Sequence, residues 1–353
     1  MSRHPVEFIT YDNALYAVKE LPVGIAEKEY NLLISMENSN LPVVHAEGYA
    51  VTRTEQGDRS ILITRYLENS LPYSSLFTVP NLKLYQDHLL DALAGLLVQL
   101  HISGIFWGDC SLYNTLFRRD AGKLQAYLVD AETAIIHENL SVNLRKHDLE
   151  IMEENVIGGL TDLVAAGILN TDYPTEETGA SIHDRYGRLW LEITREIFIT
   201  PVEKFRIQER INTLNNMGFS VSEVGLQSTV KGDQLKLSVA VTDRNFHRRL
   251  IHTTLGINGE EMQARQMINE IKEIKAWLSS ERGRSIPLNV AAFHWQNQYY
   301  QPVIDQLSEI RQEGITDPEL YCQFLTHKWL LSEKAQIDVG REAAILDFKI
   351  HTD

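Results

Sequence analysis

The sequence has very few cysteines, and they lie far apart. Cys110 and Cys322 are the two cysteines among 353 residues, and neither belongs to a Cys-x2-Cys pair. This excludes a disulfide framework and a cysteine-based zinc site. Two isolated thiols in a long chain are typical of a reducing compartment, so we expect a cytoplasmic protein.

Basic residues and long apolar runs are also scarce. Lys and Arg total 33 against 48 Asp and Glu, which gives a net charge of −15. We therefore expect no nucleic-acid partner and no broad contact with anionic membranes. The most apolar window, residues 84–100, contains Gln86, Asp87 and Asp91, so we expect no membrane span. Residues 1–7 lack the apolar core of a signal peptide.

Glycine is missing from the first 19 residues. What is present there is alternating apolar residues on both sides of a turn pair, Asp12-Asn13, which predicts a hairpin. Apolar spacing predicts a helix over 25–36, and residues 43–51 and 59–67 read as further strands. The first 68 residues are therefore expected to form a small sheet with one helix.

The next part of the chain has a different character. Leucines at intervals of three and four predict an amphipathic helix over 84–101, and two short strands, 115–117 and 124–129, follow around a polar turn. Residues 146–168 read as a helix, and residues 170–179 as a linker. Beyond it we expect helices over 181–198 and 201–216. A strand over 235–241 should pair with 219–228, and an α-helical region should end the chain.

The residues with the strongest chemical signal lie between the leucine helix and residue 130. Asp109 follows a glycine, Asn114 stands five residues later, and Asp130 ends an apolar strand. This order is typical of phosphoryl-transfer enzymes of the protein-kinase type. Asp109 would be the base that takes a proton from the acceptor hydroxyl, and Asn114 and Asp130 would be Mg²⁺ ligands.

Residues that position a nucleotide are expected in the first 68. Lys19 ends an apolar strand, where its ammonium group can reach phosphates, and Glu29 on the next helix is predicted to pair with it, with Glu27 as the alternative. The strand that contains Ile63, Arg65 and Tyr66 fits the interlobe hinge that would hold adenine.

The glycine-rich phosphate loop of kinases would fall near residues 2–4, which contain no glycine. Two readings stay open at this place: either Arg3 contacts the phosphate directly, or the start of the lobe is missing. Four further positions differ from the kinase pattern, namely Trp107, Ser111 and the Ala131-Glu132 pair that replaces Phe-Gly.

The segment Leu100-His101-Ile102-Ser103-Gly104-Ile105-Phe106-Trp107-Gly108-Asp109 resembles the lipopolysaccharide-kinase and aminoglycoside-phosphotransferase branch of kinases. The Asp130-Ala131-Glu132-Thr133 and His327-Lys328-Trp329-Leu330 segments are similar to a bacterial family with that front half and a C-terminal domain of unknown function, family 4032. His101 and Asp148 would support the catalytic loop, as in many kinases. The resemblance covers nearly the whole chain.

The expected fold is α+β, an atypical two-lobed kinase-like fold followed by a C-terminal α/β domain. Its predicted parts are a small lobe (1–68), a large lobe (69–175) and a C-terminal domain (176–353). The expected function is transfer of a phosphoryl group from ATP, or another nucleoside triphosphate, with Mg²⁺ to a hydroxyl-bearing acceptor. Two alternatives remain open. One is a non-catalytic nucleotide-binding module whose C-terminal domain engages a protein partner, and the other is a scaffold that binds no nucleotide.

Overall fold

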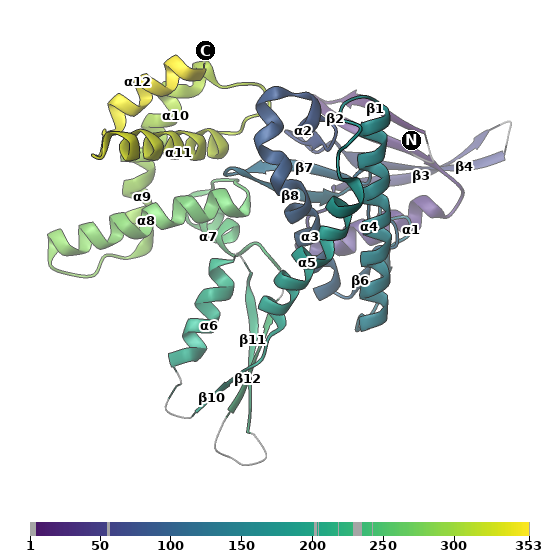
Figure 1. Cartoon of the computed structure of the whole chain (residues 1–353), viewed down its shortest axis with the longest axis horizontal. Helices are drawn as coiled ribbons and strands as arrows, with labels where there is room; N and C mark the ends of the chain where they lie inside the picture. The colour runs from purple at the N-terminus through teal and green to yellow at the C-terminus, as the bar shows by residue number, and fades with distance from the viewer. Residues whose placement is uncertain are drawn as a thin grey trace. The chain divides into compact units, whose positions relative to one another are not determined.

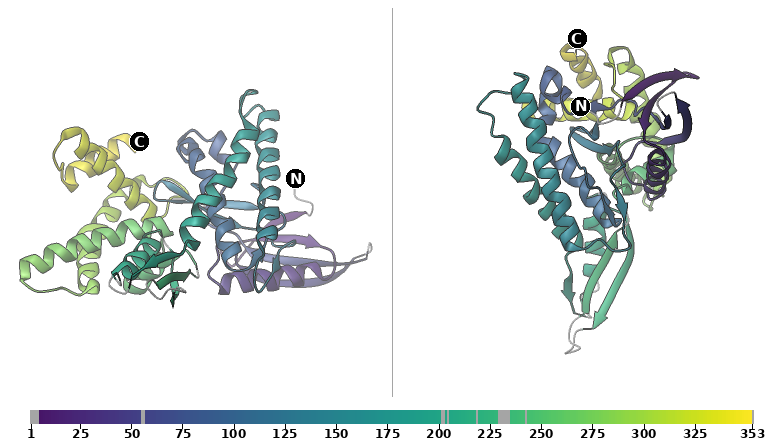
Figure 2. Two further views of the ribbon diagram at one scale, coloured as in Figure 1. Left: turned by 60° about the horizontal axis from the view of Figure 1, so that its bottom comes forward. Right: turned by 90° about the vertical axis from the view of Figure 1, so that its right-hand side faces the viewer.

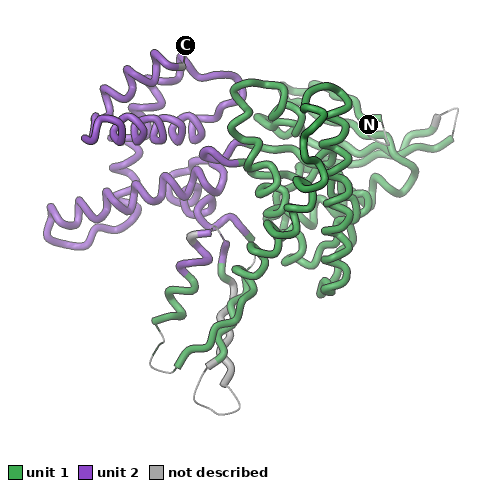
Figure 3. Tube along the Cα trace, in the orientation of Figure 1, with its two compact units in different colours: residues 1–118, 124–211, 221–243 green, residues 119–123, 212–220, 244–353 purple. Residues whose placement is uncertain are grey.

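The computed structural model describes residues 5–54, 57–200, 203, 205–217, 219–228, 235–241 and 243–352. These residues form two compact units (Figure 3). The first unit contains residues 1–118, 124–211 and 221–243, and the second contains residues 119–123, 212–220 and 244–353. Helices and strands alternate along the chain, which confirms the α+β prediction.

The first unit begins with a four-stranded antiparallel sheet in the order β1-β2-β4-β3 (Figure 1). The sheet and its helix comprise β1 (Val6–Tyr11), β2 (Ala14–Leu21), α1 (Ile25–Asn38), β3 (Ala46–Thr54) and β4 (Gly57–Arg65). Asp12 and Asn13 both have positive φ, as a tight two-residue hairpin turn requires. The predicted hairpin and helix are therefore confirmed.

The leucine-rich helix, α3 (Gln86–Ile102), is the core of the next part of this unit. The leucine spacing predicted an amphipathic helix, but the second half of this helix is buried on every side, including Ala94, Gly95 and Gln99, so it is a central helix. The helices α4 (Val142–Ala165) and α5 (Thr175–Thr194) pack on each other, and α5 also packs on α3 (Figure 2).

Short strands and one short helix complete this region. They are β5 (Leu71–Pro72), α2 (Ser75–Thr78), β6 (Ile105–Phe106), β7 (Thr115–Asp120), β8 (Lys123–Leu128) and β9 (Ile135–Ile136). The strands β7 and β8 form the predicted hairpin, with its turn at Ala121-Gly122. Asn114 directly precedes β7 and Asp130 follows the end of β8. The hairpin therefore brings the two segments together, and the Val129 N–H donates to the Asn114 carbonyl.

Two element boundaries differ from the sequence prediction. The expected linker over 170–179 is helical from Thr175, because Pro174 precedes the helix and Glu176 and Glu177 favour its positive N-terminal end. The helix expected over 181–198 ends at Thr194, and β10 (Ile197–Ile199) follows. This strand pairs with β12 (Leu235–Val241), which pairs on its other side with β11 (Val221–Ser228) as predicted.

The second unit is mainly helical and has a single apolar cluster that includes Met267, Trp295 and Tyr321. Its helices are α7 (Phe246–Leu255), α8 (Glu261–Arg282), α9 (Leu288–Trp295), α10 (Gln301–Leu307), α11 (Asp317–Ala335) and α12 (Arg341–Thr352). The helix α6 (Phe205–Asn216) is divided between the units, with residues 205–211 in the first and 212–216 in the second. The Thr316 side chain caps α11 by accepting a hydrogen bond from the Glu319 N–H group.

The capping box of α8 is formed by Glu260 and Gln263. Among the described residues, no helix has both the length and the apolar content needed to cross a membrane.

Candidate active site

The structure brings Lys19, Glu29 and Asp130 together, although they are up to 111 residues apart in sequence. Lys19 Nζ lies 3.2 Å from Glu29 Oε2 and 2.7 Å from Asp130 Oδ2. Strand β2 presents the lysine, α1 presents the glutamate, and Asp130 follows β8. Glu29 is buried because its helix turns the face with Ala26, Leu33 and Met36 inward.

Glu27, the alternative partner, faces elsewhere. It is exposed, and its carboxylate accepts a 2.9 Å hydrogen bond from the Tyr49 hydroxyl. The two glutamates are two residues apart on a helix, so they cannot face the same side. Glu29 is therefore the residue that meets Lys19.

Burial and charge act in opposite directions on this pair. Burial acts to lower the pKa of Lys19, but the Glu29 and Asp130 carboxylates outweigh it and the pKa is raised overall. For Glu29, burial and then the charge of Asp130 raise the pKa to about 7, against the lowering effect of Lys19 and the Ala131 N–H. The raised pKa keeps Lys19 an ammonium group, whereas the pKa of Glu29 lies near neutral pH.

Glu132 is a member of this cluster that the sequence analysis did not single out. Its Oε2 atom lies 3.7 Å from Lys19 Nζ, and the carboxylates of Glu29, Asp130 and Glu132 offer oxygen atoms within 4.8 Å of one another. In the sequence, Glu132 belongs to the Ala131-Glu132 pair that replaces Phe-Gly, and its Asp-x-Glu spacing from Asp130 is the signal for a second acidic group. Lys28 Nζ donates to the Glu132 carbonyl, which fixes this turn.

A buried carboxylate fixes the backbone of the loop that contains Asp109. Asp148, on α4, is fully buried and accepts hydrogen bonds from the backbone N–H groups of Trp107 (2.7 Å) and Gly108 (2.8 Å). His101 Nε2 lies 3.1 Å from the same carboxylate, and its Nδ1 lies 2.8 Å from the Tyr186 hydroxyl. Both residues hold the position that the resemblance implied, under the loop.

The side chains of Asp109 and Asn114 are set by neighbours in the loop and on α4. Asn114 Nδ2 donates to the Asp109 carbonyl at 3.0 Å, and Asn114 N donates to Ser111 Oγ. Asn155, which the sequence analysis missed, donates to Cys110 O at 3.0 Å and approaches Asp109 Oδ1 at 3.4 Å. No sequence pattern marks Asn155, because α4 brings it back only in the fold.

The unusual residues around the loop have structural roles. Trp107 is fully buried, and its indole N–H donates to the Asp130 carbonyl at 2.9 Å, so it ties the Asp109 loop to the Asp130 segment. Ser111 stabilises the loop by hydrogen bonding within it, since its backbone carbonyl accepts a hydrogen bond from Thr115 Oγ1. Gly104 has φ +77°, and a Cβ there would lie 2.2 Å from the His137 carbonyl oxygen.

The predicted hinge residues lie beside Lys19 in the sheet. Ile63 is paired in register with Val18 and Arg65 with Tyr16. The N–H groups of Arg65 and Tyr66 already donate to backbone carbonyls at 2.8 Å, so these two residues would meet a nucleobase through other groups. Arg3 lies outside the described residues.

These contacts define a class of protein. A strand lysine paired with a helix glutamate, an Asp-x4-Asn loop supported by a buried aspartate, and an aspartate after the following hairpin make up a protein-kinase-like fold.

Two families match the sequence. Residues 12–173 match the Lipopolysaccharide kinase (Kdo/WaaP) family, and residues 188–351 match a Domain of unknown function (DUF4032). These two matches confirm the resemblance seen in the sequence, to a lipopolysaccharide-kinase-like front half and a C-terminal domain of unknown function. No curated protein matches it. A solved structure titled "WaaP in complex with acyl carrier protein" has 14% identity, covers 51% of this chain and 85% of that chain, and has a TM-score of 0.36.

Proposed function

We propose that the protein is a phosphotransferase of the atypical kinase type that uses ATP and Mg²⁺ and phosphorylates a hydroxyl group of its acceptor. The observation that carries the proposal is the Lys19 ammonium group, which lies within 4.0 Å of Glu29, Asp130 and Glu132. A lysine in contact with both acids is the arrangement from which kinases bind nucleotide phosphates.

The residues fit a magnesium ion. Three carboxylates share one ammonium group, and Mg²⁺ prefers oxygen ligands from one or two carboxylates together with substrate phosphates. Asp130 and Asn114 would hold the ion, and we add Glu132 to this set. The Asn114 amide nitrogen is engaged with the Asp109 carbonyl, which makes its oxygen the ligand atom. The bound ion would neutralise charge on the phosphates.

The proton acceptor in this proposal is Asp109. Its carboxylate takes the proton of the acceptor hydroxyl as the new oxygen–phosphorus bond forms and the bond to the leaving ADP oxygen breaks. Asn155 and the Asn114–Asp109 bond limit the rotation of the loop, so that the carboxylate is oriented before substrate arrives. Lys19, held by Glu29, would position the phosphates, and Arg3 and the strand of Ile63, Arg65 and Tyr66 would contact the nucleotide.

The test uses two variants and two readouts. Asp109→Asn should retain ATP binding in a thermal-shift titration with Mg²⁺ but lower γ-phosphate transfer, measured with labelled ATP and a panel of hydroxyl acceptors, by about 10²–10⁴-fold. The matched control is Asp172→Asn, an exposed aspartate in the loop between α4 and α5, which should change neither.

The outcomes separate the proposal from its alternatives. Equal transfer by Asp109→Asn and the unmodified protein would refute the role of Asp109. Binding of ATP without transfer to any acceptor would favour a nucleotide-binding module that signals through its C-terminal domain. No thermal shift with any nucleotide would favour a scaffold.

A further inference from the structure

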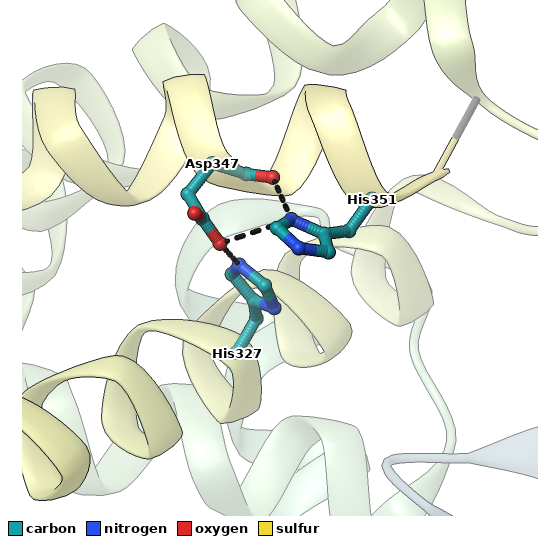
Figure 4. A group of neighbouring side chains, drawn as sticks. All are labelled: His327, Asp347 and His351. Carbon is teal, nitrogen blue, oxygen red and sulfur yellow. Dashed lines mark hydrogen bonds and ion pairs between the residues drawn. The ribbon is translucent and has the colours of Figure 1, made fainter.

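The second unit contains a cluster of nitrogen and oxygen donors on its last two helices (Figure 4). His327 lies on α11, and Asp347 and His351 lie on α12. His327 Nε2 is 2.8 Å from Asp347 Oδ2, and His351 Nδ1 is 3.2 Å from the same oxygen. Both imidazole nitrogens therefore lie close to one carboxylate oxygen, and His351 Nδ1 is also 2.9 Å from the Asp347 carbonyl oxygen, to which it donates in the absence of an ion.

The donor set matches the chemistry of a transition metal. Two imidazoles and one carboxylate, with water in the fourth position, are a ligand set that Zn²⁺ takes in proteins. One ligand atom from each residue lies within 4.8 Å of the others. Ligands at zinc bonding distances around a tetrahedral ion are roughly 3.4 Å apart, so the present separations need only a small adjustment.

The fold prepares this arrangement. Asp347 and His351 are four residues apart on α12, which puts them on one face of the helix. Between them, Phe348 is buried and packs edge-on against Phe324 and against the His327 ring, at centroid distances of 6.2 and 5.3 Å. This contact orients His327 toward α12, while side-chain exposures of 22%, 34% and 64% for His327, Asp347 and His351 leave an ion a path of entry.

We propose that His327, Asp347 and His351 bind one divalent transition-metal ion of the zinc class and that the ion links α12 to α11. The site is separate from the nucleotide chemistry proposed above and does not depend on it. The same three side chains could instead form a hydrogen-bonded ion-pair cluster without metal, and the experiment distinguishes these two cases.

The experiment is a Zn²⁺ titration of the tag-free, chelator-treated full chain by calorimetry. We expect one site that Asp347→Asn and His351→Ala each weaken by at least about tenfold. The matched control is His252→Ala, an exposed histidine on α7, which should bind as the unmodified protein does. Because the acids around Asp130 could also take zinc, the titration is repeated in Asp130→Asn, in which the proposed site should persist.

A second readout is the coordination geometry of the bound ion. Co²⁺ in place of Zn²⁺ should give the strong visible absorption of a low-coordinate nitrogen and oxygen site, and His351→Ala should abolish it. Zn²⁺ should also slow amide exchange in 341–351, where the ion holds α12. Zinc binding that is unchanged in both ligand variants, or absent altogether, would overturn the proposal, and the cluster would then be an ion pair only.

Discussion

The raised pKa of Glu29 predicts an unusual response to pH. In the folded protein, burial and the charge of Asp130 raise the pKa of this carboxyl from 4.5 to about 7. An acid with a raised pKa binds its proton more tightly in the folded state than in the unfolded state. Stability from this group is therefore fully present below about pH 4.5 and is lost as the pH rises to about 7.

The size of the effect follows from the shift. Each pKa unit corresponds to about 1.4 kcal/mol, and most of the titration falls between pH 5 and pH 8, so Glu29 should lower the free energy of unfolding by about 2.5 kcal/mol over that range. The side chain is fully buried, so solvent screening does not reduce this figure. In Glu29→Gln the group cannot titrate, and its contribution to the slope disappears.

The measurement is urea unfolding of both proteins at several pH values from 5 to 8, without nucleotide or metal. The difference in free energy between the unmodified protein and Glu29→Gln cancels the other titrating groups. That difference should become less favourable to the unmodified protein by about 2.5 kcal/mol as the pH rises. The reasoning is refuted if the difference is constant, or if it changes with the opposite sign.

Three further substitutions test other parts of the structure. Asp148→Ala leaves two backbone N–H groups and a histidine without their buried acceptor, and urea unfolding should show a loss of about 3–5 kcal/mol. A loss below about 1 kcal/mol would contradict the role of Asp148 under the loop. Gly104→Ala adds a contact at 2.2 Å to the His137 carbonyl, whereas Gly122→Ala has the same φ of +77° and open space, so only the first should cost more than about 2 kcal/mol. Asp120, whose pKa is raised to about 7 mainly by burial and then by Glu260, should make unfolding easier as pH rises from 4 to 7, and Asp120→Asn should remove that slope.

The local elements of the fold could be predicted because their signals are local. The turn pair Asp12-Asn13 and the spacing of Ala26, Leu33 and Met36 specify a hairpin and a helix from adjacent residues. The end of α5 could not be predicted in this way. Only Ile197 and Phe198 are apolar in the last four residues of the expected helix. Residues 197–199 pair instead with β12, where Ile197 lies opposite Leu237 and Ile199 opposite Leu235, and that distant pairing decides their structure.

The residues of the candidate site also divide into those that a sequence pattern indicates and those that only the fold brings together. Lys19, Glu29 and Asp130 could be proposed because kinases use these residue types in this order, and the structure brings the three together. Asn155 could not be proposed from the sequence, since an asparagine within a helix carries no signal until α4 returns it to the Asp109 loop. The sequence shows an acid at position 132, but only the structure shows that Glu132 belongs to the site, because it lies beside the same lysine as Asp130.

The charge of the site explains how a lobe without glycines near residues 2–4 could still hold phosphate. In the structure Lys19 Nζ contacts Asp130 Oδ2 at 2.7 Å, so the ammonium group is already committed to a carboxylate. A nucleotide alone must compete with Asp130 for the lysine and approach three acids. In the proposed function, Asp130 and Glu132 would hold a cation, whose charge would neutralise the acids and leave Lys19 available to the phosphates. The proposed function therefore predicts that metal and nucleotide bind more tightly together than either one binds alone.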